Sequence, residues 1–294
     1  MRQVESLKRF TLTDMVIGFF LTLFGIIIIY PFYNAILVSL VPQHVYVKTP
    51  FMLYPSEITL ETYKFVFGNG ALINGLKVTV YILIFGVIYN MLLTVLTAYA
   101  LTKPLPGKKI IMGLIIFTLY FNGGLIPYYL LIGDIGLMDK IGSMIFPTGF
   151  TVLYMLIIKS FFEDLPQELE ESAKIDGAND FTILFRIILP LSLPILATFS
   201  LYYCVERWNE WWNGMLFIKS AGKRPLQLIL RTIVQDASDM LSSEAAMDAS
   251  RDQKVFADGI KMASIIVTMF PVMCLYPFLQ KYFVKGLTIG AVKS

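Results

Sequence analysis

Six stretches of the chain contain no Asp, Glu, Lys, Arg or His, and the charged residues gather between them. The six uncharged stretches are Met15–Val41, Val78–Leu101, Ile110–Gly133, Ile141–Ile158, Ile187–Val205 and Met262–Gln280. Each reaches or approaches the ~20 residues that a helix needs to cross a hydrocarbon core of ~30 Å. The pattern therefore predicts an all-α, polytopic membrane protein with six transmembrane helices.

The composition agrees with this interpretation. Of the 294 residues, 56% are hydrophobic and only 15% are charged, which excludes an ordinary soluble domain. The first stretch follows a basic arm, as a signal peptide does. Its 27 uncharged residues exceed the apolar region of a signal, and no small-residue cleavage site follows, so we expect a retained helix.

Lysines and arginines in short connections indicate the orientation of the helices. The N-terminal arm, the connection after the second stretch and the C-terminal tail each carry three lysines or arginines. These residues are Arg2, Lys8, Arg9, Lys103, Lys108, Lys109, Lys281, Lys285 and Lys293. We therefore expect both termini in the cytoplasm, with a cytoplasmic arm at 1–14 and a membrane domain at 15–294. The same alternation places a loop at 163–186 inside and a loop at 206–259 outside.

The inner loop contains "EESAKIDGANDFTILFRIILP", residues 170 to 190, where two short helices are expected. Asp164 is a candidate cap for the first helix. Leu165, Leu169 and Ala173 then form an apolar stripe at helical spacing, and Gly177 ends the helix. A second helix is expected to begin at Asn179 or Asp180 and to continue into the fifth stretch.

The spacing in this loop resembles a signature of bacterial ABC importer permeases, Glu-Ala-Ala-x3-Gly-x9-Ile-x-Leu-Pro. The matching residues are Glu171, Ser172, Ala173, Gly177, Ile187, Leu189 and Pro190, with Ser172 in place of the first alanine. The segment "GLKVTVYILIFGVIYNMLLTVLTAYAL" and the end "GLTIGAVKS" are similar to permeases of the maltose-transporter type. The resemblance implies the type I importer permease fold, in which the loop helix docks on an ATPase subunit. The alternatives to docking are that the loop is merely solvated, with charged faces, and that Glu171 caps or solvates its own loop.

The resemblance also implies partners: a second homologous permease, two ATP-binding cassette subunits, an extracytoplasmic solute-binding protein and an oligosaccharide. It places the chain in the lipid of a bacterial cytoplasmic membrane. The sequence contains no G-x-x-x-x-G-K-[ST] loop, so ATP and Mg²⁺ are expected on the partner and no cofactor in this chain. The chain has a single histidine, His44, so we expect no metal site. It has no catalytic motif, so we do not expect an enzyme. No nucleic-acid partner is expected.

A sugar path needs hydrogen-bonding groups and flat aromatic faces. Candidates are polar breaks within the second and third stretches and a cluster where the fifth stretch meets the outer surface. These candidates are Asn90, Asn122, Tyr202, Glu206, Trp208, Asn209, Glu210 and Trp212. The alternatives are helix-packing contacts for the asparagines and an interfacial aromatic belt for the cluster. An ion pair between Arg207 and Glu210 is also compatible with their spacing.

Other functions are compatible with six spans. A permease for a non-sugar solute would share the loop signature, and a six-helix channel or secondary transporter would need ion sites within the spans. The closest resemblance is to permeases for complex or acidic oligosaccharides, such as fragments of alginate or pectin. The sequence by itself does not identify the sugar.

Overall fold

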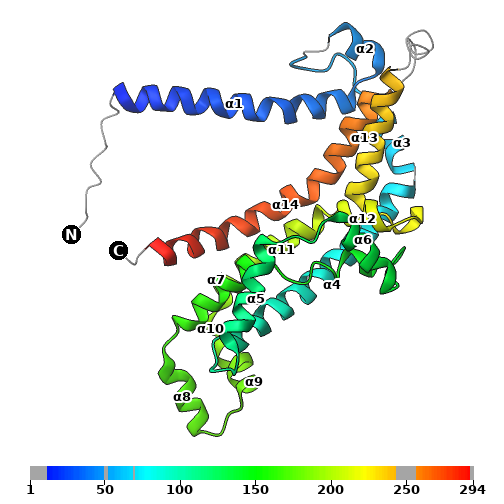
Figure 1. Cartoon of the computed structure of the whole chain (residues 1–294). Helices are drawn as coiled ribbons and strands as arrows, with labels where there is room; N and C mark the ends of the chain where they lie inside the picture. The colour runs from blue at the N-terminus through cyan, green and yellow to red at the C-terminus, as the bar shows by residue number, and fades with distance from the viewer. Residues whose placement is uncertain (1–11, 50–51, 69, 243–255, 292–294) are drawn as a thin grey trace. The chain divides into compact units, whose positions relative to one another are not determined.

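The computed structural model describes residues 12–49, 52–68, 70–242 and 256–291, and its regular elements in these ranges are all helical (Figure 1). The all-α expectation is therefore confirmed. In chain order the elements are α1 (Leu12–Leu40), α2 (Gln43–Lys48), α3 (Glu61–Gly68), α4 (Gly70–Ala100), α5 (Lys108–Tyr120), α6 (Leu125–Asp134), the 3-10 turn η1 (Ile141–Met144), α7 (Val152–Glu163), α8 (Gln167–Ile175), α9 (Asp180–Ile183), the π-helical turn η2 (Leu184–Ile188), α10 (Leu189–Leu191), α11 (Leu193–Trp208), α12 (Trp212–Phe217), the 3-10 turn η3 (Ala221–Lys223), α13 (Leu226–Ser242) and α14 (Ala257–Ala291).

The chain divides into two compact units, each of which is described by itself. The first comprises residues 1–68 and 233–267. In this unit α1 exposes its apolar side chains over most of its length, and only its C-terminal end is buried. There, Leu37 and Val41 pack with Val45 and Met52 in a small core, and Ser39 shares a hydrogen bond of 2.8 Å with Tyr63.

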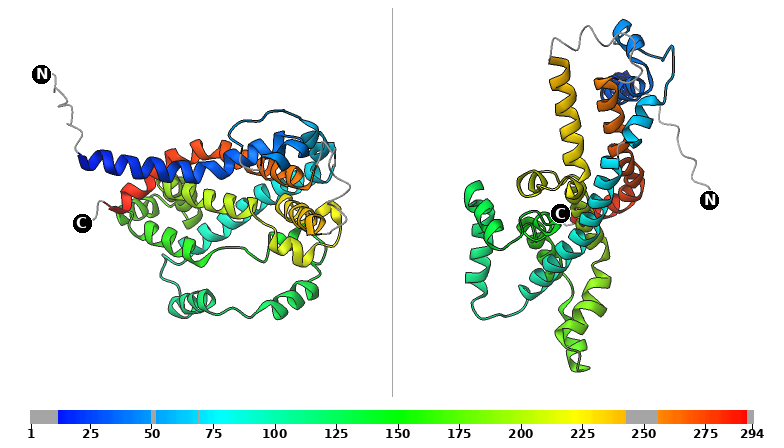
Figure 2. Two further views of the ribbon diagram at one scale, coloured as in Figure 1. Left: turned by 90° about the horizontal axis from the view of Figure 1, so that it is seen from above. Right: turned by 90° about the vertical axis from the view of Figure 1, so that its right-hand side faces the viewer.

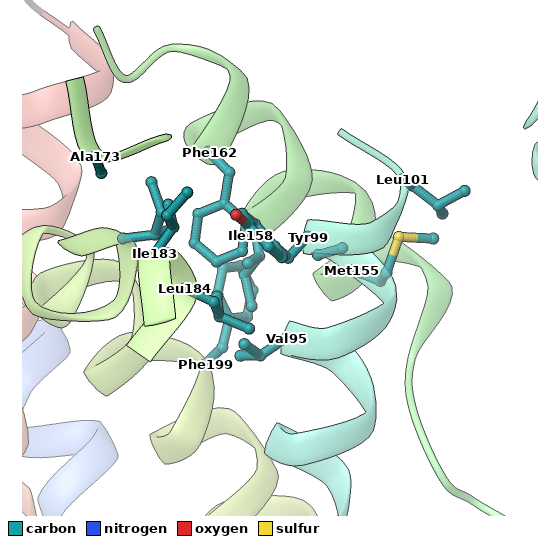
Figure 3. Packing of buried hydrophobic residues seen from close by; sticks show 12 residues of the cluster. Val95, Tyr99, Leu101, Met155, Ile158, Phe162, Ala173, Ile183, Leu184 and Phe199 are labelled. Carbon is teal, nitrogen blue, oxygen red and sulfur yellow. The ribbon is translucent and has the colours of Figure 1, made fainter. Parts of the chain in front are cut away.

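The second unit, residues 69–232 and 268–294, holds the larger core. Side chains from α4, α7, α8, α9 and α11 converge there (Figure 3). Figure 3 shows Tyr99 of α4, Phe162 of α7, Ile183 of α9 and Phe199 of α11 around a common centre. In the right-hand view of Figure 2, as in Figure 1, α8 projects at one end of this unit.

Three described helices are long and apolar enough to cross a membrane, and up to five spans result if each of two bent helix pairs is one span. A count of six is therefore not confirmed. The expected continuous span Ile141–Ile158 is wrong, because residues 145–151 are not helical and α7 begins only at Val152. The segment contains Pro147 and Gly149, both unfavourable inside a helix.

Irregular backbone in a membrane protein is tolerated where other protein groups satisfy its carbonyls. Here Arg207 of α11 does so: Nη1 donates to the Met144 carbonyl at 2.7 Å, and Nη2 donates to the Thr148 carbonyl at 2.7 Å. Asn90 of α4 donates to the carbonyls of Thr148 and Gly149 at 2.6 and 2.7 Å, and accepts from Arg207 Nε at 3.0 Å. The segment 145–151 is thereby tied to both α4 and α11.

Two features bring α4 and α11 close enough for this network. A Cβ on Gly86 would lie 2.9 Å from Cδ of Arg207, so the glycine makes the space that the arginine stem fills. One helical turn before Arg207 on α11, Tyr203 shares a hydrogen bond of 2.8 Å with Thr94 and accepts one of 2.9 Å from the Thr151 backbone N–H. The non-helical segment is thus held at both of its ends.

The bent pairs change two further expectations. The pair α5 and α6 bends by 117° across residues 121–124. The helices from Asp180 to Leu191 meet α11 at 86°, with Ser192 between them. The expectation that the second loop helix continues straight into the fifth span is therefore wrong. Pro190 and Pro194 flank the break, and each proline removes a backbone donor.

Replacing Arg207 with Met should destabilise the second unit. The methionine keeps an apolar stem but leaves the Met144 and Thr148 carbonyls without these donors and Glu210 without its charge partner. The expected loss is on the order of 3 kcal/mol in the free energy of unfolding. Chemical denaturation of the detergent-solubilised protein measures it, with Arg186→Met at an exposed arginine as the matched control. Equal denaturation midpoints for the two variants would contradict the role of Arg207.

Candidate functional site

The inner loop forms the helix, turn and second helix that its sequence indicates. The helix α8 ends in a glycine turn: Gly177 has φ +79°, the Ala178 N–H donates to the Ala173 carbonyl at 2.9 Å, and the Gly177 N–H donates to the Lys174 carbonyl at 3.0 Å. This is a Schellman arrangement, which favours glycine at the left-handed position. The Asn179 side chain then caps α9 by accepting from the Thr182 N–H at 2.8 Å.

The start of α8 differs from the expectation. Asp164 lies at the C-terminal end of α7 rather than capping α8, and α8 begins at Gln167 directly after Pro166. Leu165 precedes the helix and is half-buried against the core, so it does not share a helical stripe with Leu169 and Ala173. Pro166 has no backbone N–H, which suits a position just before a helix.

The residues of the loop signature divide into an inward and an outward group. Ala173 is buried in the core of the second unit, and Ile187 and Leu189 are half-buried against it. Glu171, Ser172 and Pro190 are exposed. The inward group thus fixes the position of α8, and the outward group is left available for a partner.

A neighbouring ion pair fixes α8 from its other side. Lys103, in the connection after α4, pairs with Glu170, and its ammonium lies 4.2 Å from the ring centre of Tyr99. Burial acts to lower the pKa of Lys103, but the hydrogen bonds to Glu170 and Tyr99 outweigh it and hold the pKa above its ordinary value. Of the two adjacent glutamates, Glu170 is therefore paired within this chain, and Glu171 is exposed.

The loop also exposes apolar side chains. Leu169 and Ile175 of α8 have exposed fractions of 39% and 86%. Phe181 and Phe185 are also exposed. An open depression of about 620 Å³ lies beside α8 and is lined by Lys103, Gln167, Glu171, Lys174 and others. Ile175 was not a sequence candidate, because the apolar stripe counted from Leu165 does not include its position.

The polar candidates at the end of the fifth stretch lie on different faces of α11 and of the turn that follows it. Tyr202, Glu206 and Asn209 are spaced four and three residues apart and are all exposed, so they lie along one face. Tyr154 of α7 joins this face: its hydroxyl donates to Glu206 Oε1 at 2.8 Å, and its ring stacks on Tyr202 with centres 5.7 Å apart. We call Tyr154, Tyr202, Glu206 and Asn209 the α11 face.

The remaining candidates lie elsewhere. Asn90 and Trp208 are buried, and Asn90 belongs to the Arg207 network. Glu210 is half-buried, lies 3.9 Å from Arg207 and accepts two hydrogen bonds of 3.0 Å from Asn213. Asn122 stands in the bend between α5 and α6, where its side chain accepts from the Gly124 N–H at 2.9 Å.

Next to the α11 face, Trp211 and Trp212 meet edge to face with ring centres 5.4 Å apart. Trp212 is exposed and Trp211 is half-buried. The Arg207–Glu210 pair that the spacing allows is present, and Arg207 also donates to the Met144 carbonyl, to the carbonyl and hydroxyl of Thr148 and to the Asn90 side chain. The network itself was not predicted from the sequence. Two signals could have indicated it: Arg207 close to the end of one apolar stretch and Asn90 within another.

Comparisons with known proteins agree with the loop signature. The family model described as "Binding-protein-dependent transport system inner membrane component" matches residues 9–289. The chain is 39% identical over 284 residues to the polygalacturonan/rhamnogalacturonan transport system permease protein YtcP of Bacillus subtilis (strain 168), covering 96% of this chain and 99% of the relative. It is 38% identical over 271 residues to Protein LplC of the same organism, covering 92% and 91%.

A solved structure is similar over nearly the whole chain. It is the crystal structure of a bacterial ABC transporter involved in the import of the acidic polysaccharide alginate, with a TM-score of 0.84 and 28% identity. The match covers 94% of this chain and 99% of that chain. Together with the family match over residues 9–289, it shows that this chain belongs to the family of inner membrane components of binding-protein-dependent transport systems, the permeases of ABC importers.

Proposed function

We propose that this chain is a permease subunit of an ATP-driven importer for acidic oligosaccharides. The observation that carries the proposal is the shared chemistry of two similar proteins. The relative YtcP is a permease for polygalacturonan and rhamnogalacturonan, and the similar structure belongs to an importer of alginate. All of these polymers contain uronic acids, so their fragments carry carboxylates.

The energy for transport enters through α8. Its exposed Glu171 and Ser172, with the exposed apolar side chains of Leu169 and Ile175, suit a groove on an ATPase subunit that offers apolar contacts and a basic group. That partner binds ATP and Mg²⁺, and this chain supplies no cofactor site. Because Ala173, Ile187 and Leu189 pack in or against the core of the second unit, a movement of α8 is transmitted to that core.

The α11 face lines the sugar path in this proposal. Polar side chains on a membrane helix are costly against lipid and are expected to face protein or water. Tyr202 and Tyr154 offer aromatic rings to the apolar faces of a pyranose, while Glu206 and Asn209 offer hydrogen-bonding groups to its hydroxyls. The proposed path leaves out Asn90 and Trp208, which are buried.

The assembly contains a second homologous permease, two ATPase subunits and an extracytoplasmic binding protein that delivers the sugar. The distribution of Lys and Arg places both termini in the cytoplasm of a bacterium, with α8 inside and the loop 206–259 outside. Residues 243–255 of that loop lie outside the described residues. ATP binding draws the α8 helices together and opens the path outward, and hydrolysis reverses the change.

A channel or a secondary transporter is less well supported. Such proteins place ionisable residues at ion sites within their spans. The buried charge that α11 does contain, Arg207, is occupied by carbonyls and by Asn90, which is a packing role. A permease for a non-sugar solute remains as an outcome of the transport test.

The first test is uptake by the complete complex in proteoliposomes. Tetragalacturonate presented with the binding protein should be accumulated in an ATP-dependent manner, and phosphate, a polyamine and maltotetraose should not. The reason is that the homologous systems carry chains of uronic acids. Accumulation of phosphate or polyamine alone would overturn the sugar assignment, and uptake without ATP would overturn the importer assignment.

The second test concerns the glycine turn of α8. Valine is strongly disfavoured at a backbone φ of +79°, so Gly177→Val should displace the end of α8. We expect a protein that is inserted at normal abundance but has lost most sugar-stimulated ATPase activity and uptake. Gly177→Asn is the matched control, because asparagine tolerates the left-handed region. If Gly177→Val retains full stimulation and uptake, α8 does not couple this chain to the ATPase.

A further inference from the structure

An arginine and a tryptophan that are twenty residues apart in sequence meet beside the α11 face. The guanidinium carbon of Arg231, on α13, lies 4.1 Å from the ring centre of Trp211. Arg231 is exposed, and it forms none of the ion pairs found among the described residues. Arg231 was not among the sequence candidates for the sugar path.

Packing fixes the position of this pair. The Leu226 N–H donates to the Thr79 hydroxyl of α4 at 2.8 Å, and a Cβ on Gly75 would lie 2.5 Å from Ile229 Cδ1, so the start of α13 lies directly on α4. A Cβ on Gly214 of α12 would lie 3.0 Å from the ring of Pro225. The helix α12, which directly follows Trp211, and the start of α13 are therefore held together by close contacts other than the pair itself.

Stacking on an indole orients a guanidinium without using its hydrogen-bond donors. The five N–H groups lie in the plane of the guanidinium and point outward from its edge, so a stacked arginine can still bind a carboxylate with two parallel bonds. The rotamer entropy lost on binding is smaller than for a free arginine, because the stack already restricts the side chain. This is a suitable receptor for a carboxylate on a sugar ring.

The exposed ring of Trp212 supplies the second half of such a site. Its centre lies 5.4 Å from that of Trp211, so the Arg231 guanidinium is no farther than about 10 Å from it. A short run of linked pyranose rings can bridge this separation. The Gln227 side chain on α13 donates to Asn209 of the α11 face at 3.4 Å, so the pair adjoins the proposed path.

The glutamates at the end of α11 have partners other than Arg231. Glu206 accepts from the Tyr154 hydroxyl at 2.8 Å, and Glu210 is engaged by Asn213 and lies 3.9 Å from Arg207. Neither carboxylate forms an ion pair with Arg231.

We infer that Arg231, stacked on Trp211, binds a uronate carboxylate while Trp212 stacks on the sugar ring, so that this cluster selects acidic oligosaccharides at the entrance to the path. The inference rests on the proposed function, because it takes an acidic oligosaccharide as the substrate. It assigns the choice of charge to the permease itself, in addition to whatever selection the binding protein makes.

The test compares variants in the complete complex, with tetragalacturonate as the probe. Arg231→Gln removes the charge and should lower tetragalacturonate uptake by about tenfold or more, the loss expected for a charge-assisted bidentate bond. Arg231→Lys keeps the charge without the planar fork and should lose less. Lys219→Gln, at another exposed basic residue of the same outer region, is the matched control and should transport normally.

Two further measurements separate the possible causes. Membrane abundance and thermal stability of Arg231→Gln should equal those of the unmodified protein, because the side chain is exposed. ATPase stimulation by the loaded binding protein should also be unchanged. If stimulation falls together with uptake, Arg231 is a docking contact for the binding protein and the inference is wrong. Unchanged uptake in Arg231→Gln would overturn it as well.

Failure of the proposed function gives a different result. In that case the unmodified complex does not accumulate tetragalacturonate, although another solute stimulates its ATPase. The inference alone fails when the unmodified complex accumulates tetragalacturonate and Arg231→Gln does so at the same rate.

Discussion

The arrangement of the second unit depends on the satisfaction of carbonyl groups in a non-helical segment between membrane helices. Unpaired backbone groups are expensive in an apolar environment, and residues 145–151 cannot pair within a helix. Arg207 and Asn90 supply the missing donors from two different helices. A charged residue at the end of an apolar helix is therefore retained here for its geometry, since one guanidinium reaches the carbonyls of both Met144 and Thr148.

This constraint also decides which polar residues remain available for a solute. Because Arg207 must point toward α4, the rotation of α11 about its axis is fixed. Tyr202, Glu206 and Asn209 are then exposed on one face, while Tyr203 and Trp208 are buried. At the other end of the unit, Lys103 and the buried Ala173 hold α8 so that Glu171 and Ser172 are exposed. One core thus connects the proposed sugar path to the proposed docking helix.

The features that the sequence predicted well are those set by local rules. Hydrophobic stretches predicted an all-α membrane protein, and Gly177 and Asn179 predicted the end of one loop helix and the start of the next. These outcomes follow from side-chain and backbone preferences of single residues. The family that the loop sequence resembles was confirmed by the family match over residues 9–289.

The features that were missed depend on contacts between distant residues. An uncharged stretch at Ile141–Ile158 has the composition of a span; Pro147 and Gly149 disfavour a helix there, and the donors from Arg207 and Asn90 allow residues 145–151 to remain non-helical. The burial of Asn90 and the 86° bend at Ser192 likewise arise from packing partners far away in the sequence. The contact between Trp211, which directly precedes α12, and Arg231 of α13 was not predicted, because nothing local in the sequence relates these two positions.

The central claim is that the α11 face lines a path whose access alternates, and accessibility of a cysteine at Tyr202 tests it most directly. In the complete complex, with Cys204 and Cys274 replaced by serine, the rate of reaction of Tyr202→Cys with an impermeant thiol reagent is measured from the outside. The account predicts a slow reaction without nucleotide and a much faster one in the vanadate-trapped state, while Lys219→Cys, at an exposed position of the loop that we place outside, reacts equally in both states. Equal rates for Tyr202→Cys in the two states would contradict the account.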